Sequence, residues 1–125
     1  MKRLSAILAA GALFLFGAAD ARADIFTVMV KSLPNVFSPA EMTIFTGDGI
    51  VWVWLPGVTH SSTSDTGLWD SGLHANPFRF RRIFLTAGDF PYFCMIHGAP
   101  GGIGMSGIIH VLPHPGEWRF EEEPF

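Results

Sequence analysis

Cysteine is almost absent from this sequence: there is one, Cys94, among 125 residues. A single thiol excludes an internal disulfide bond, so an exported domain of this size must be held together by its apolar core. A bound metal is a further source of stability. A solitary cysteine in an oxidising compartment is also chemically exposed, unless a metal or the protein core protects it. Whether Cys94 needs such protection depends on whether the chain is exported.

The only long apolar run is Leu4–Ala19, which follows two basic residues at the start of the chain. It is too short and too poorly flanked for a membrane span, and Ala21–Ala23 fits the small-x-small pattern at which signal peptidase cleaves. We predict that residues 1–23 are a signal peptide, cleaved after Ala23, and that residues 24–125 form one domain in the periplasm or another exported location. An uncleaved N-terminal anchor is the alternative, and both interpretations send the domain across a membrane.

Basic residues are also scarce in the predicted mature domain. Once the predicted signal peptide, with its three basic residues and one acidic residue, is set aside, five basic and ten acidic residues remain. Nucleic-acid binding needs clustered Lys and Arg to replace the counterions along the phosphates. The acidic balance therefore argues against a nucleic-acid partner.

No segment after residue 24 has the length and apolar periodicity of a convincing helix. Short runs rich in Val, Ile, Phe and Trp alternate instead with clusters of Gly, Pro, Asp and Asn, which is typical of strands joined by turns. The pattern predicts an all-β sandwich. The expected strands are residues 25–30, 42–45, 50–54, 78–85, 90–94 and 108–112.

Two of these segments carry more information than the rest. In the run 50–54, Ile50, Trp52 and Trp54 share one face, and Val, Ile and Trp suit a half-buried pleated surface, so we expect a central strand there. Residues 56–77 are rich in Gly, Ser, Thr and Asp and are expected to form long connections. Functional residues are often placed on such loops.

Candidate metal ligands are concentrated after the strand 90–94. Cys94 and His97 are separated by two residues, and Met105 follows after a glycine-rich segment. If the strand ends at Cys94 and the chain turns at once, both side chains can reach one metal, and a second imidazole must come from elsewhere. A thiolate, two imidazoles and a distant thioether form the ligand set of copper electron-transfer sites. Zinc accepts the first three ligands but gains little from a thioether, so Met105 favours copper.

These residues resemble a known family. Residues 92–98 and 104–111 are similar to the C-terminal copper loop and last strand of the plastocyanin, pseudoazurin and amicyanin group of cupredoxins, and residues 47–52 and 69–88 resemble its earlier segments in the same order. The resemblance implies a Greek-key β-sandwich that binds one type 1 (blue) copper ion, cycling between Cu(I) and Cu(II). It implies that the ligands are His60, Cys94, His97 and Met105.

The resemblance has two departures. Trp54 and Leu55 stand near the position where many relatives have an Asn, and the second, more important departure is in the copper loop. The loop expected at Gly98–Gly104 is longer than the corresponding loop of plant plastocyanin, although its glycines would let it fold back. The axial role of Met105 depends on that folding. Met95 competes for the role by position, but it is expected to point away from the metal because adjacent side chains of an extended chain lie on opposite sides. Ser61, directly after His60, is expected either to brace the Cys94 loop by a hydrogen bond or to be an ordinary loop serine.

The other histidines are expected to be non-ligands. In the last predicted strand Ile109 and Val111 would face the core, which leaves His110 on the outer face. His114 is confined between two prolines. His74, in the loop-rich segment, is likewise expected to be a non-ligand.

The implied function is the transfer of single electrons between redox protein partners by a monomeric carrier. No small-molecule substrate and no enzymatic activity are expected, because no Ser-His-Asp arrangement and no further histidine cluster is apparent. Partners are expected to dock near the exposed edge of His97, where the surrounding residues are all apolar. These are Leu55, Pro56, Val58, Ala99, Pro100 and Ile103. A periplasmic copper carrier or sensor is the main alternative, and a metal-free interaction domain is the third.

Overall fold

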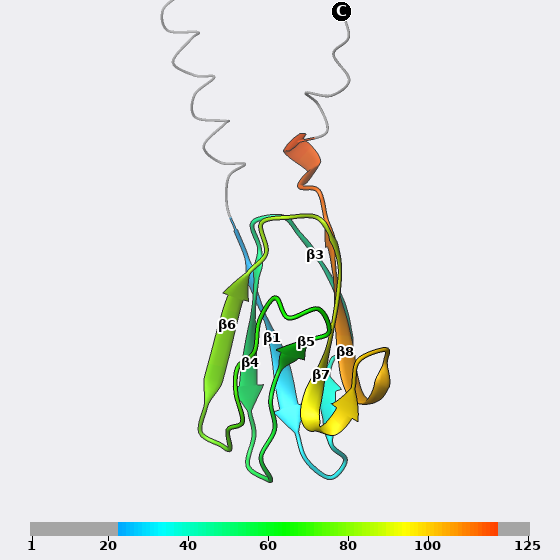
Figure 1. Cartoon of the computed structure of the whole chain (residues 1–125). Helices are drawn as coiled ribbons and strands as arrows, with labels where there is room; N and C mark the ends of the chain where they lie inside the picture. The colour runs from blue at the N-terminus through cyan, green and yellow to red at the C-terminus, as the bar shows by residue number, and fades with distance from the viewer. Residues whose placement is uncertain (1–22, 118–125) are drawn as a thin grey trace, which may run out of the picture.

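The structure is a computed structural model that describes residues 23–117 (Figure 1). These residues form eight strands and one short 3₁₀ helix. The elements are β1 (Ile25–Lys31), β2 (Val36–Ser38), β3 (Glu41–Phe45), β4 (Gly49–Trp54), β5 (Thr63–Ser64), β6 (Arg79–Ile83), β7 (Gly88–Ala99), β8 (Ile103–Leu112) and η1 (Pro115–Glu117). Apart from Ala23, the predicted signal peptide lies outside the described residues. Among residues 23–117 no helix has the length and apolar character needed to cross a membrane.

The strands form two four-stranded sheets, in the orders β2-β1-β4-β6 and β3-β8-β7-β5. Two pairs are parallel, β1 with β4 and β3 with β8, and the other neighbours are antiparallel. The chain passes from the first sheet to the second at β3 and returns at β4. The predicted all-β sandwich is therefore confirmed, with six predicted strands in place.

β4 is an interior strand of its sheet, as its sequence predicted. It pairs with β1 on one side and β6 on the other, and Ile50, Trp52 and Trp54 are all buried. The ring of Trp52 lies 5.4 Å from that of Tyr92 and 5.6 Å from that of Trp69, measured between centroids. Tyr92 belongs to the opposite sheet, so these edge-to-face and tilted aromatic contacts join the two layers through the centre of the core.

The predicted glycine-rich loop between residues 98 and 104 is wrong as a description of this segment. β7 continues to Ala99 and β8 begins at Ile103, so that Gly98 pairs with Gly104 and Ala99 with Ile103 in a hairpin. Gly104 has φ +66°, and a Cβ atom there would collide with the carbonyl oxygen of His97. Glycine at position 104 therefore permits the close approach of the two strands of this hairpin.

The register of β7 against β8 is interrupted between Phe93 and Gly98. In a regular strand, side chains three positions apart point to opposite faces, which would separate Cys94 from His97. An irregularity of this kind bends the strand and re-aims its side chains. We predicted that the strand ends at Cys94; instead it continues, and this interruption performs the turn that the metal site requires.

The candidate site and the ends of the described chain lie at opposite ends of the sandwich. In Figure 1 the first residues of β1 and the helix η1 are at the top. The loop that follows β4 and the curled part of β7 are at the bottom. We call this lower end the copper end, because it holds the predicted copper ligands His60, Cys94 and His97.

Candidate metal centre

His60 lies in the loop after β4, and its backbone is fixed on two sides. The amide of His60 donates to the carbonyl of His74 at 2.9 Å, and the amide of His74 donates back at 3.0 Å. The indole Nε1 of Trp54 also donates to the carbonyl oxygen of His60, at 3.1 Å. The last residue of a buried strand thus holds the histidine backbone in place.

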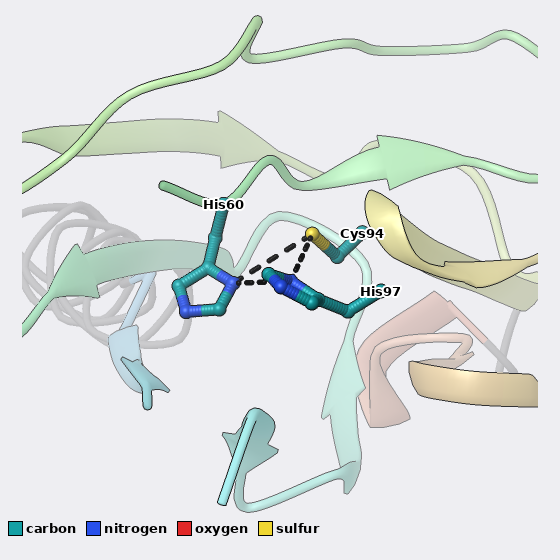
Figure 2. A group of neighbouring side chains, drawn as sticks. All are labelled: His60, Cys94 and His97. Atoms are coloured by element: carbon teal, nitrogen blue, oxygen red, sulfur yellow. Dashed lines mark hydrogen bonds between the residues drawn. The ribbon is translucent and has the colours of Figure 1, made fainter. Parts of the chain in front are cut away.

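Three donor atoms converge at the copper end (Figure 2). The Sγ atom of Cys94 lies 3.7 Å from Nδ1 of His60 and 3.6 Å from Nδ1 of His97, and the two Nδ1 atoms are 3.1 Å apart. In the plane of these three atoms, the point equidistant from them is about 2.0 Å from each. That separation is in the range of metal–imidazole bonds, about 2.0–2.1 Å, and somewhat below that of metal–thiolate bonds, about 2.3 Å.

The surroundings of these atoms favour a bound cation. Cys94 and His60 are fully buried and His97 is partly buried. Burial, and secondarily the nearby His97, lower the pKa of His60 below its ordinary value of 6.5. His60 is thereby held in the neutral form that binds metals. Two ring nitrogens and a sulfur that face one another repel when all three present lone pairs, and a cation between them removes that repulsion.

Met105 lies on β8, buried, and belongs to the same core cluster as Cys94. A Cβ atom added at Gly98, the residue after His97, would lie 2.9 Å from the backbone nitrogen of Met105. The hairpin therefore brings the backbone of Met105 beside that of Gly98, next in sequence to His97. Its thioether as an axial ligand stays a prediction.

Ser61 contacts the cysteine segment through two hydrogen bonds. Its amide nitrogen donates to Sγ of Cys94 at 3.5 Å, and its hydroxyl oxygen accepts from the amide of Met95 at 2.9 Å. The predicted bracing of the Cys94 loop by Ser61 is confirmed. Hydrogen bonds of this kind orient a thiolate ligand and tune its donor strength.

The positions of His110 and Met95 agree with the predictions made for them. His74 stacks on Phe78, with ring centroids 3.5 Å apart, and its Nε2 bonds to the carbonyl of Ser71. His110 lies on the outer face between two carboxylates. The side chain of Met95 is 43% exposed, whereas Cys94 beside it is buried. Within residues 23–117, the group of potential metal-binding His, Cys, Asp and Glu residues contains His60, Cys94 and His97 alone.

The sequence reasoning missed Ser32. Its Oγ atom lies 2.9 Å from Nε2 of His60, the ring nitrogen that points away from the other two donors (Figure 2). The two residues are 28 positions apart. No motif spacing links a serine in an early turn to a histidine in a later loop, so only the folded chain could reveal this contact.

Comparison with curated proteins identifies relatives. The chain is 32% identical over 87 residues to a plastocyanin of Scenedesmus fuscus, an alignment that covers 86% of that protein and 61% of this chain. The chain belongs to the plastocyanin-like cupredoxins. A chloroplastic plastocyanin of Tetradesmus obliquus is 30% identical over 80 residues, which span 55% of each protein. No protein-family profile matches this cupredoxin.

Solved structures agree with the fold of this cupredoxin. A purple cupredoxin from Nitrosopumilus maritimus superimposes with a TM-score of 0.57 at 21% identity, over 68% of this chain and 97% of that one. An amicyanin variant superimposes with a TM-score of 0.58 at 18% identity, over 69% and 80%. The predicted cupredoxin-like Greek-key sandwich is thus confirmed. The family and the three converging donors together show a site for one copper ion of type 1.

Proposed function

We propose that this cupredoxin is an exported carrier of single electrons between redox protein partners. One observation carries the proposal: His60 Nδ1, Cys94 Sγ and His97 Nδ1 converge on a common point in the buried end of the sandwich. We assign these three residues as the strong copper ligands and Met105 as the weak axial ligand. When bound, copper supplies one-electron chemistry between Cu(I) and Cu(II).

The residues around the site favour electron transfer over exchange of the metal. His60 is held by Trp54 and His74, and Cys94 by Ser61, so these two donors would stay in place in either oxidation state of a bound copper. A rigid ligand set means that little rearrangement accompanies each step. Transfer is then outer-sphere, and no substrate is bound or altered.

The apolar residues expected around His97 support docking there, and we call them the apolar rim: Leu55, Pro56, Val58, Ala99, Pro100 and Ile103. His97 is only partly buried, and two apolar side chains at the rim, Val58 and Ile103, are 53% and 61% exposed. Exposure of both argues that they are available to a partner, because side chains that closed the site by packing on each other would be covered. Exposed apolar patches on a small protein mark contact surfaces, and transient redox encounters use small ones.

Export and the monomeric state are part of the same proposal. Export is supported by the apolar run and cleavage pattern at the start of the sequence, before the described residues. The predicted mature domain carries a net acidic charge. This charge provides electrostatic steering as the domain approaches its partners.

A copper carrier or sensor is the second candidate, and burial of the ligands weighs against it. Such proteins favour accessible, exchangeable ligands, whereas His60 and Cys94 are fully buried. An enzyme is a more distant candidate. A copper-containing nitrite reductase from Thermus scotoductus shares the fold with a TM-score of 0.55 and 22% identity, but this chain matches 22% of its length.

Titration of the metal-free protein with Cu(II), followed by visible absorption and voltammetry, tests the function. We expect one equivalent of copper, an intense sulfur-to-copper charge-transfer band and a reversible one-electron wave. A copper carrier or sensor would bind copper without reversible cycling, and an interaction domain would stay colourless. Either result would overturn the proposal.

A further inference from the structure

Ser32 lies in the turn that joins β1 to β2 and reaches across to the loop that carries His60. Its Oγ atom is 2.9 Å from Nε2 of His60 and 3.1 Å from the amide nitrogen of Val58. Gly57, between β4 and His60, has φ +151°, and a Cβ atom there would collide with Oγ of Ser32. The serine hydroxyl is therefore in close contact with this loop, and a side chain at position 57 would collide with it.

The direction of these hydrogen bonds follows from the other side of the imidazole ring. Nδ1 of His60 faces Cys94 and His97, so in a neutral ring that binds a metal through Nδ1 the proton must be on Nε2. The amide of Val58 can only donate. With a metal on Nδ1, Ser32 Oγ therefore accepts both hydrogen bonds, one from the ring and one from the backbone, through its two lone pairs.

We propose that Ser32 is a positioning residue for the copper site, whose hydroxyl accepts a hydrogen bond from Nε2–H of His60 and so aims Nδ1 at the metal. The inference rests on the proposed role of His60 as a copper ligand. A hydrogen bond to the distal ring nitrogen fixes the orientation of a metal-binding histidine and raises its donor strength. A side chain provides it here, so one substitution can remove it without changing the ligand set.

The rival explanation is that Ser32 only ties two loops together through the amide of Val58. That role would affect folding stability in general and would leave the tautomer of His60 unchanged. The two explanations therefore differ in what the ring nitrogens of His60 report and in how copper affinity changes relative to stability.

The test compares Ser32→Ala with the wild-type protein and with Ser38→Ala, a matched serine on the neighbouring strand β2. Nitrogen-15 NMR of the metal-free protein, at a pH where His60 is neutral, should show one Nε2–H tautomer in wild type and a mixture in Ser32→Ala. Competition with a Cu(I) chelator should show copper binding weakened about 10–100-fold in Ser32→Ala, as for other residues of this kind. Ser38→Ala should match wild type in both measurements.

A second variant removes the contact while keeping the hydroxyl group. Gly57→Ala should push Ser32 aside and shift the tautomer in the same direction as Ser32→Ala. An unchanged tautomer together with unchanged copper affinity in Ser32→Ala, or an equal loss in Ser38→Ala, would overturn the inference. If wild-type protein fails to bind copper, the proposed function and the copper role of Ser32 both fail. The tautomer measurement still decides whether Ser32 orients His60.

Discussion

The copper end and the outer face of the β3-β8-β7-β5 sheet each contain a histidine with two close partners, and the partners give these histidines opposite properties. His60 is buried, and its Nδ1 faces a sulfur and a second imidazole. His110 lies on the outer face, where its two ring nitrogens are each 2.7 Å from a carboxylate oxygen, of Asp89 and of Glu41. Burial lowers the pKa of His60, whereas hydrogen bonds to Asp89 and Glu41 raise the pKa of His110.

The difference shows that the surroundings, and not the residue type, decide what a histidine does. A neutral ring among soft donors is suited to a metal, and a protonated ring between carboxylates is suited to an ion pair. At His110 the two carboxylates lie at different nitrogens of the ring. The two carboxylates and one ring nitrogen therefore do not converge on a common point where a metal ion could bind. The four predictions below test this contrast, beginning with the copper end.

Removing the thiolate should have the largest effect. Cys94→Ser is expected to abolish the charge-transfer colour, because the thiolate is the chromophore, while the β-rich circular dichroism spectrum persists. Visible absorption after copper addition is the measurement, and His110→Gln, which should stay blue, is the control. A blue Cys94→Ser protein would show that the assignment of the site is wrong.

Changing the axial position should have a smaller effect at the same end. Met105→Leu is expected to retain copper and colour and to raise the reduction potential, since loss of a weak axial donor disfavours Cu(II). Voltammetry of the two proteins provides the comparison. Loss of copper would make Met105 a stronger ligand than we propose, and an unchanged potential would assign the axial role to another group, such as a carbonyl of the hairpin.

A charge on the apolar rim should alter partner exchange and leave the metal unaffected. Ile103→Lys is expected to slow electron exchange with the physiological partner, because it places a charge in an apolar contact, with spectrum and potential nearly unchanged. Stopped-flow mixing measures the rate. Leu85→Lys, at an exposed apolar residue in the loop after β6, is a control outside this rim. Equal rates for wild type and Ile103→Lys would rule out docking at this rim.

The ion pairs of His110 should give the smallest effect, and its sign follows from the raised pKa. Protonated His110 is stabilised in the folded state, so this contribution is complete below the ordinary pKa of 6.5 and is lost as pH rises through the folded-state pKa. Wild type should exceed His110→Gln in unfolding free energy at acidic pH, by about 1 kcal/mol or less, because the partners are largely exposed. Urea unfolding of both metal-free proteins across this pH range is the measurement, and a gap that widens with rising pH would contradict the prediction.

The parts of this protein that could be predicted from sequence are those with local patterns. The apolar residues Ile50, Trp52 and Trp54 occupy every second position, which predicts one buried face of a strand, because successive side chains of any strand point to opposite faces. Cys94 and His97 were recognisable as a pair because three positions separate them. His60 was reached through the order of motifs in a family resemblance, since a single histidine in a loop has no local pattern.

The sequence by itself therefore determined the strand content, the all-β class and the donor types of the metal site, because each depends on neighbouring residues. Only the tertiary structure decided how β7 bends between Phe93 and Gly98, and that Ser32 meets His60. It also decided that Glu41 reaches His110 across 69 positions of the chain. Contacts between distant segments depend on strand register and on backbone approaches that glycine permits, and such approaches exist only once both sheets have formed.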